Sequence, residues 1–247
     1  MKRKTNVLLL TIVLVGCISV IGCWYGIPTF SKSYVQEYML YDGIKVRRAI
    51  THSTKYLDLY VNITRRVNFL SKGEDKKMYD KICEMYGDTE YNQEVFLVAE
   101  GVPMVSVEYP ACAAIEVVST RDFDAEHPAG TSLTDIMSVK YQSAAGYIES
   151  GYTDLEDLFE WKVRPLNELQ PQDLALSVHN IFLIFDKEPD VLEQHALSIK
   201  WTSADGNTYT TTYNYDFSLP EGRVEPWTEV TYDTIYNPYI DNNKVFR

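Results

Sequence analysis

The sequence predicts a mainly β fold, an Ig-like or related antiparallel β-sandwich with one short helix, placed after an N-terminal signal or anchor segment. Residues 57–64 alternate apolar and polar side chains, which is typical of a strand with one buried face. Residues 181–185 are apolar on both faces and predict a central strand. Residues 196–202 and 208–215 flank a short polar segment that contains glycine, which is a hairpin signal.

The other elements are predicted in order along the chain. Residues 44–50 predict a short strand. Residues 71–86 predict an amphipathic helix, because Met78, Ile82 and Met85 recur at helical spacing. Further strands are predicted at residues 95–99, 102–109, 113–119 and 160–163, and a connection at residues 166–175.

The late hairpin also has a predicted register. A three-residue loop at residues 205–207 gives the hairpin one apolar and aromatic face and one polar face. The expected pairs are Leu197 with Tyr215, Ile199 with Tyr213, and Trp201 with Thr211. We interpret Trp201 and these tyrosines as core residues rather than as an exposed platform for stacking sugars, because burial is the default use of aromatic side chains.

The first 27 residues have the layout of a secretory signal, with three basic residues followed by an apolar run. Two tetrapeptides, which end at Cys17 and Cys23, resemble the bacterial lipobox, where the signal is cut before an acylated cysteine. Cleavage before Cys23 is favoured, because it leaves the polar residues 29–33 as a tether. The signal peptide is then residues 1–22.

An uncleaved anchor is the alternative interpretation of the same segment. Residues 7–27 contain no charge, and 21 residues in a helix cover about 30 Å, enough to cross a bilayer. Under both interpretations the positive charges precede the apolar run. The bulk of the chain is therefore expected outside the cytoplasm, membrane-anchored, in the periplasm or at the cell surface.

Two parts are expected after the signal. Residues 23–94 are predicted to be a tether and a small mixed α/β region, and residues 95–247 a β-sandwich domain. About 220 exported residues are enough to bury a sizeable core.

Charge excludes one class of partner. The chain has 23 basic and 35 acidic residues, a net charge of -12, and so acidic a surface repels nucleic acid. Residues 45–81 are locally basic, with ten basic and four acidic residues. They predict either a surface attracted to anionic lipid headgroups or simply solvated faces.

No common catalytic or cofactor motif is present. The sequence lacks His-Glu-x-x-His, Gly-x-Ser-x-Gly, a phosphate-binding Gly-rich loop and Cys-x-x-Cys, so no cofactor is expected. One polar cluster holds carboxylates at alternate positions, Asp122, Asp124 and Glu126, like the start of a calcium loop. It departs from that pattern at His127, where glycine is needed, and at Leu133, where a bidentate glutamate belongs.

Cys83 and Cys112 are the two cysteines beyond the N-terminal segment. In an oxidising envelope they could form a disulfide, which would stabilise the fold by roughly 3 to 4 kcal/mol. The alternative is that both are small buried residues.

The second half of the chain resembles a known group of proteins. The resemblance rests on residues 105–109 and 115–119, on Arg121-Asp122-Phe123, on the loop at residues 128–135 and on the late hairpin with Asp205-Gly206. These segments are similar to uncharacterised envelope lipoproteins of gut bacteroidetes, a family with a domain of unknown function. The resemblance implies an Ig-like or related β-sandwich with no assigned catalytic residues.

These observations predict a lipid-anchored, extracytoplasmic binding or structural protein without a catalytic role, whose ligand is a protein or a glycan. One alternative is an envelope glycoside hydrolase that uses a carboxylate pair, with Asp122, Asp124 and Glu126 as first candidates. The other is an assembly subunit that exchanges a strand at an exposed sheet edge.

Overall fold

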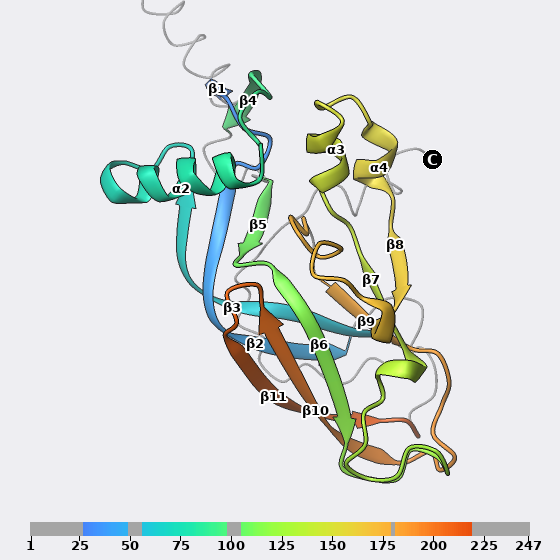
Figure 1. Ribbon diagram of the computed structural model, residues 1–247. Coiled ribbons are helices and arrows are strands. Elements are labelled where there is room, and N and C mark those ends of the chain that lie inside the picture. The colour runs from blue at the N-terminus through green and yellow to red at the C-terminus, as the bar shows by residue number, and fades with distance from the viewer. Residues whose placement is uncertain (1–26, 49–55, 98–104, 179–180, 219–247) are drawn as a thin grey trace, which may run out of the picture.

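The computed structural model describes residues 27–48, 56–97, 105–178 and 181–218 (Figure 1). The described chain is mainly β, as predicted, with eleven named strands and short helices. The strands are β1 (Ile27–Ser31), β2 (Glu37–Arg48), β3 (Tyr56–Asn68), β4 (Gln93–Leu97), β5 (Ser106–Tyr109), β6 (Cys112–Ser119), β7 (Met137–Tyr141), β8 (Lys162–Pro165), β9 (Ile181–Phe185), β10 (Gln194–Ser203) and β11 (Thr208–Asp216). The helices are α2 (Gly73–Met85), α3 (Ala145–Glu149) and α4 (Leu155–Phe159), with 3-10 turns η1 (Thr134–Ile136) and η2 (Leu166–Glu168).

The predicted signal peptide and its alternative, the uncleaved anchor, fall on residues outside the described ranges, apart from Ile27. Cys17 and Cys23 are outside them as well. No helix within the described ranges combines the length and the hydropathy that a membrane span requires.

The strands form three sheets. A six-stranded sheet has the order β5-β2-β3-β9-β7-β8, a three-stranded sheet has the order β11-β10-β6, and β1 pairs with β4. The pairs are antiparallel except for β2 and β5, which run parallel, so the large sheet is mixed rather than purely antiparallel.

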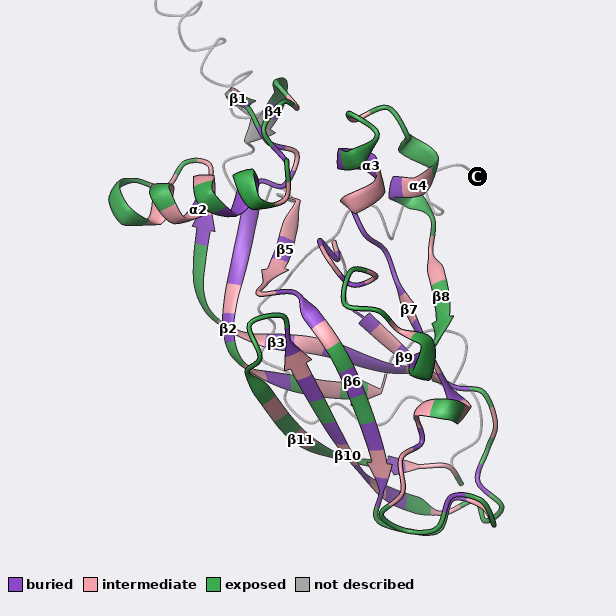
Figure 2. Cartoon of the chain, in the orientation of Figure 1, coloured by how far each residue is buried: buried purple, intermediate pink, exposed green. Residues whose placement is uncertain are grey.

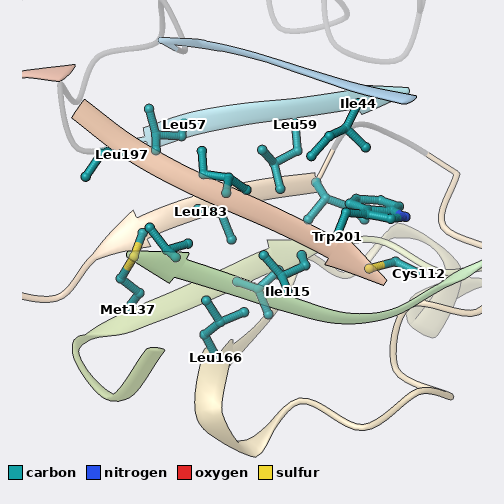
Figure 3. Close-up of a cluster of buried hydrophobic side chains, with 14 of the residues drawn as sticks. Ile44, Leu57, Leu59, Cys112, Ile115, Met137, Leu166, Leu183, Leu197 and Trp201 are labelled. Atoms are coloured by element: carbon teal, nitrogen blue, oxygen red, sulfur yellow. The ribbon is translucent and has the colours of Figure 1, made fainter. Parts of the chain in front are cut away.

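The main core lies between the large sheet and the three-stranded sheet, which makes the architecture sandwich-like (Figure 3). Alternation along the strands explains it. In β3, Leu57, Leu59 and Val61 are buried, and in β10 Leu197, Ile199 and Trp201 are buried, so each strand turns one apolar face inward. Figure 2 shows the same change between buried and exposed residues along β6.

A second core fills the other end of β2 and β3, beneath the helices. It gathers Tyr38 of β2, Val67 of β3, and residues of α2, α3 and α4. The predicted helix at residues 71–86 is confirmed as α2, which buries Tyr79, Ile82 and Cys83. Gly87 follows it at φ +70°, the left-handed conformation that glycine adopts freely just beyond a helix end.

Strands β2 and β3 reach both cores because they are long and their pairing is irregular. The register shifts twice between Leu40 and Ile44: the first shift leaves one extra residue on β3, and the second leaves one extra residue on β2. Such bulges bend a strand and increase its twist. The pair of β2 and β3 therefore contributes one half of its length to the main core and the other half to the second core (Figure 1).

Two features of the predicted organisation change. Strands from both sides of residue 94 join the same sheet, since β2 pairs with β5 and β3 pairs with β9. The expected parts, residues 23–94 and 95–247, therefore share one sheet. The predicted tether at residues 29–33 is largely strand β1, because residues 93–97 supply it with a partner.

The predicted hairpin register is wrong by two residues, although the apolar and aromatic residues share one face of the hairpin as predicted. Leu197 pairs with Tyr213, Ile199 with Thr211 and Trp201 with Tyr209. The turn is longer than expected, because the Ser203 N–H donates to the Asn207 carbonyl and the Asp205 carboxylate accepts from the Ser203 hydroxyl. Gly206 takes the positive φ of +87° that this turn needs.

The interpretation of the hairpin aromatics as core residues is confirmed for Trp201 and Tyr215, which are 0% and 3% exposed. Tyr209 and Tyr213 are partly buried and pack against the same cluster. Trp201 therefore offers no ring face to a sugar in this structure.

Of the two alternatives for the cysteines, the structure has two small buried residues and not a disulfide, because Cys83 and Cys112 are free and lie in different cores. Cys83 packs in the helical core on α2, whereas Cys112 starts β6 in the sandwich core (Figure 3). Each behaves as a small apolar residue with a weak S–H donor.

We expect two reactive thiols in a chain that carries Cys17→Ser and Cys23→Ser, measured after denaturation without reductant. The same count should follow treatment with a mild oxidant before denaturation, because both thiols are buried. A count below one would contradict the separation of the two cores.

Candidate functional site

The polar cluster singled out in the sequence lies in the connection between β6 and β7, at residues 120–136, which we call the Asp-His loop. Two buried side chains attach it to the sandwich core, Phe123 and Leu133, both 0% exposed. The Phe123 ring stacks on Phe185, with centroids 6.0 Å apart. The Leu133 N–H donates to the Val117 carbonyl at 2.8 Å. The loop is thus an ordered part of the fold.

His127 is the centre of this loop. Its Nδ1 lies 2.7 Å from Asp124 Oδ1, and its Nε2 lies 3.1 Å from both carboxylate oxygens of Asp135. The imidazole is only 7% exposed and both of its nitrogens face carboxylates. This arrangement favours the imidazolium form, which donates from both nitrogens.

Asp124 connects the loop to a second segment. Its Oδ1 accepts the N–H groups of Glu126 and His127 at 2.8 and 2.9 Å, a local turn typical of aspartate. Its Oδ2 forms an ion pair with Lys187 Nζ at 2.6 Å, just beyond β9. The Asp-His loop is therefore fixed to β9 by a line of alternating charges that runs from Asp135 through His127 and Asp124 to Lys187.

The pKa values of these groups shift in consistent directions. The Lys187 ammonium, followed by the His127 imidazole, lowers the pKa of Asp124 below its usual range. Asp124 first and Asp135 second raise the pKa of His127, and His127 in turn lowers the pKa of Asp135. Each shift favours the charged form.

The three carboxylates predicted as a calcium or catalytic cluster do not converge. Asp122 accepts the Ala129 N–H at 2.7 Å, Asp124 is held by His127 and Lys187, and Glu126 is exposed. Within residues 27–48, 56–97, 105–178 and 181–218, no group of three or more His, Cys, Asp or Glu is placed to hold a metal ion. The described geometry therefore does not support the calcium interpretation of this loop, because Asp122 and Asp124 have separate partners and Asp124 already contacts two cationic side chains.

A Ser-His pair lies near this loop. Ser119 Oγ is 2.9 Å from His195 Nδ1, a spacing seen between a nucleophile and its base. Both residues are buried, at 1% and 0% exposure, and Ser119 Oγ also accepts the Arg121 N–H. Burial lowers the pKa of His195, so the ring is held neutral. A substrate has no access to this pair in the structure, and its role is to join β6 to β10.

Glu108, on the edge strand β5, was missed by sequence reasoning. Burial first and the Asp58 carboxylate second raise its pKa to about 8. A carboxyl of this kind can act as a general acid near neutral pH. Its electrostatic neighbour Asp58 is buried and paired with Arg47 at 2.6 Å, so it is not an available nucleophile. No sequence signal marks Glu108, because its environment comes from the packing of the sheet.

A cluster of tyrosines lies over the helical core, around the buried carboxylate of Asp88. Tyr34, Tyr91 and Tyr152 meet edge to face, with centroids 5.3 and 5.4 Å apart. The Asp88 carboxylate accepts the N–H groups of Tyr34 and Val35 and the Tyr152 hydroxyl. Since the rings cover one another, the cluster holds segments together and does not form a flat platform.

Comparisons with family models, with curated proteins and with solved structures give no match for this chain.

Loss of the His127 contacts should have a pH-dependent cost. The raised pKa of His127 gives stability that is complete below the ordinary histidine value of about 6.5 and is lost as pH rises through the folded-state value. The lowered pKa of Asp124 gives stability above about 3.9 that is lost as pH falls. His127→Gln should therefore destabilise the chain by about 1–3 kcal/mol at pH 5.5 and by less at pH 8.5, in chemical denaturation.

Glu126→Gln is the matched control, because it changes an exposed neighbour in the same loop. Its effect should be small at both pH values. An equal effect of His127→Gln at pH 5.5 and pH 8.5 would contradict a charged imidazole in this loop.

Proposed function

We propose that this chain is a membrane-anchored extracytoplasmic protein that binds a protein or glycan partner and does not catalyse a reaction. The observation that carries the proposal is where the fold begins. Strand β1 starts at Ile27, four positions after Cys23, the residue predicted to be lipidated. The predicted anchor thus lies only a few positions before the first described strand, which pairs with β4 beside the helical core.

The contacts within the Asp-His loop favour a structural role for this loop over a catalytic one. Its charged groups neutralise one another, and its aspartate has a lowered pKa, whereas a general acid needs a raised one. The resemblance to envelope lipoproteins of unknown function points to the same class of protein.

The glycoside hydrolase is the second candidate, and Glu108 is the observation that favours it. Its raised pKa suits a general acid, but a hydrolase also needs a second carboxylate at about 5 Å or 6.5–9.5 Å across a cleft. The strand-exchange alternative has less support, because Tyr213 of the edge strand β11 accepts the Arg48 N–H, which places β2 beside that edge.

A glycan array with the full chain in detergent separates these candidates. The proposal expects either saturable binding to a glycan without release of reducing sugar, or no glycan binding and specific photo-cross-links to an envelope protein in cells. Reducing sugar released by the unaltered chain but not by Glu108→Gln would contradict the proposal and establish the hydrolase.

A further inference from the structure

The distance between the predicted lipid and the folded domain is short. Ile27 is four positions after Cys23, and an extended chain spans at most 3.3–3.6 Å per residue, so Ile27 lies within about 14 Å of the residue predicted to be acylated. Since Ile27 begins β1, the end of the molecule that carries β1 and β4 must lie at the bilayer if Cys23 holds the lipid (Figure 1).

That end exposes large apolar side chains. Phe30 of β1 is 58% exposed, and Leu70, in the turn between β3 and α2, is 46% exposed. Phe69, the neighbour of Leu70 in the chain, lines the same hollow of about 250 Å³ as Phe30, together with Lys32 and Lys76, so the segments that carry Phe30 and Leu70 lie side by side. Single exposed apolar residues are ordinary, but these lie at the end of the domain that the short link to the predicted anchor holds close to the bilayer.

Several charges at this end are paired. Arg65 pairs with Asp75, Lys76 with Asp80, and Lys77 with Glu74. These pairs neutralise three of the basic residues at this end and weaken their attraction to anionic lipid. A contact with lipid here would depend on apolar insertion and would change little with salt.

We propose that Phe30 and Leu70 insert into the interface of the bilayer that holds the anchor and so fix the orientation of the domain on the membrane. The inference rests on the proposed anchoring, and it adds a second attachment formed by the folded domain itself. The lipid alone holds the chain at the bilayer but leaves the tilt of the domain open, and an apolar contact made by the domain itself limits that tilt. The sandwich and the Asp-His loop would then point away from the membrane.

The test places an environment-sensitive fluorophore at Phe30→Cys in the full chain that also carries Cys17→Ser. Cys83 and Cys112 are buried and do not compete for the label. The matched control is Leu192→Cys, because Leu192 is 51% exposed in the segment before β10. This segment lies beside the Asp-His loop, since the Asp190 N–H donates to the Phe123 carbonyl. The proteins are purified from cells that acylate lipoproteins and reconstituted in phosphatidylethanolamine and phosphatidylglycerol vesicles with nitroxide-labelled lipid.

We expect the chain to float with the vesicles, and we expect lipid nitroxide to quench the label at position 30 at least threefold more than the label at position 192. The ratio should be the same in low and high salt. Equal quenching at the two positions in a chain that floats would overturn the inference and leave the anchoring intact. A chain that fails to float would overturn the proposed anchoring, and this inference with it.

A second measurement avoids a label at the contact itself. Phe30→Ser combined with Leu70→Ser, with the fluorophore at Thr29→Cys, should lower quenching to the level of position 192. Val191→Ser combined with Leu192→Ser is the control and should leave quenching at position 29 unchanged. Unchanged quenching in the Phe30 and Leu70 variant would contradict a role for these two side chains.

Discussion

Replacing Asp88 with alanine is expected to destabilise the protein by about 3 kcal/mol, one of the two largest effects of any single substitution considered for this chain. The Asp88 carboxylate is 0% exposed and accepts hydrogen bonds from the Tyr34 N–H at 2.7 Å, the Val35 N–H at 2.8 Å and the Tyr152 hydroxyl at 3.0 Å. Each buried donor that loses its acceptor costs about 1–3 kcal/mol. Burial raises the pKa of the Asp88 carboxyl, which means that burial disfavours its charged form. Alanine removes this unfavourable burial, and that gain offsets part of the cost.

The measurement is chemical denaturation, together with hydrogen exchange of the α2 amides. Asp88 joins the segment before β2 to the turn after α3, so its loss should open the helical core first. Asp80→Ala is the matched control, because Asp80 is half-exposed on α2 and its pair with Lys76 is worth at most about 1 kcal/mol. Equal effects of the two substitutions would contradict the role of Asp88.

Trp201→Ala should cost about 3–5 kcal/mol, the usual loss when a large aromatic core residue is truncated. Trp201 is 0% exposed, packs edge to face on Tyr41, and donates from Nε1 to the Tyr41 hydroxyl at 3.1 Å. Tyr41 in turn donates to the Pro110 carbonyl at 2.7 Å. The substitution removes the ring that joins β10 to β2 and the start of this chain of hydrogen bonds.

For a chain of this length such a loss lowers the melting temperature by roughly 6–20 °C, which thermal unfolding followed by circular dichroism can measure. Trp161→Ala is the control, because Trp161 is only partly buried, against Phe182. Its effect should be less than half as large. Unchanged stability in Trp201→Ala with loss of glycan binding would instead favour the sugar-stacking interpretation.

The elements that could be predicted from sequence are those whose pattern is long enough to be periodic. Strand β3 alternates over its first half, β9 is continuously apolar, and α2 has three apolar residues at helical spacing. Helices α3 and α4 have five residues each, which is too short to repeat the helical spacing, and the five residues of β1 do not alternate apolar and polar side chains. In β7, Met137, Val139 and Tyr141 do alternate with polar residues, so this signal was present and was missed.

The candidate site shows the same limit. His127 follows Asp124 by three residues, and a local turn brings the two together. Lys187 is distant in sequence, and it arrives because β7 pairs with β9 and the Asp186 N–H donates to the Ile136 carbonyl at 3.0 Å. A pairing of this kind depends on the whole sheet, so the charge that neutralises Asp124 could not be found from the loop alone.

Metabolic labelling with palmitate is the most direct test of the account, because the proposed function and the orientation on the membrane both depend on the acylated cysteine. The unaltered chain and Cys17→Ala should incorporate the label, whereas Cys23→Ala should not. Label that is retained in Cys23→Ala and lost in Cys17→Ala would place the anchor six residues farther from β1 and remove the argument for close contact with the bilayer. No label on the unaltered chain would contradict the lipid anchor itself.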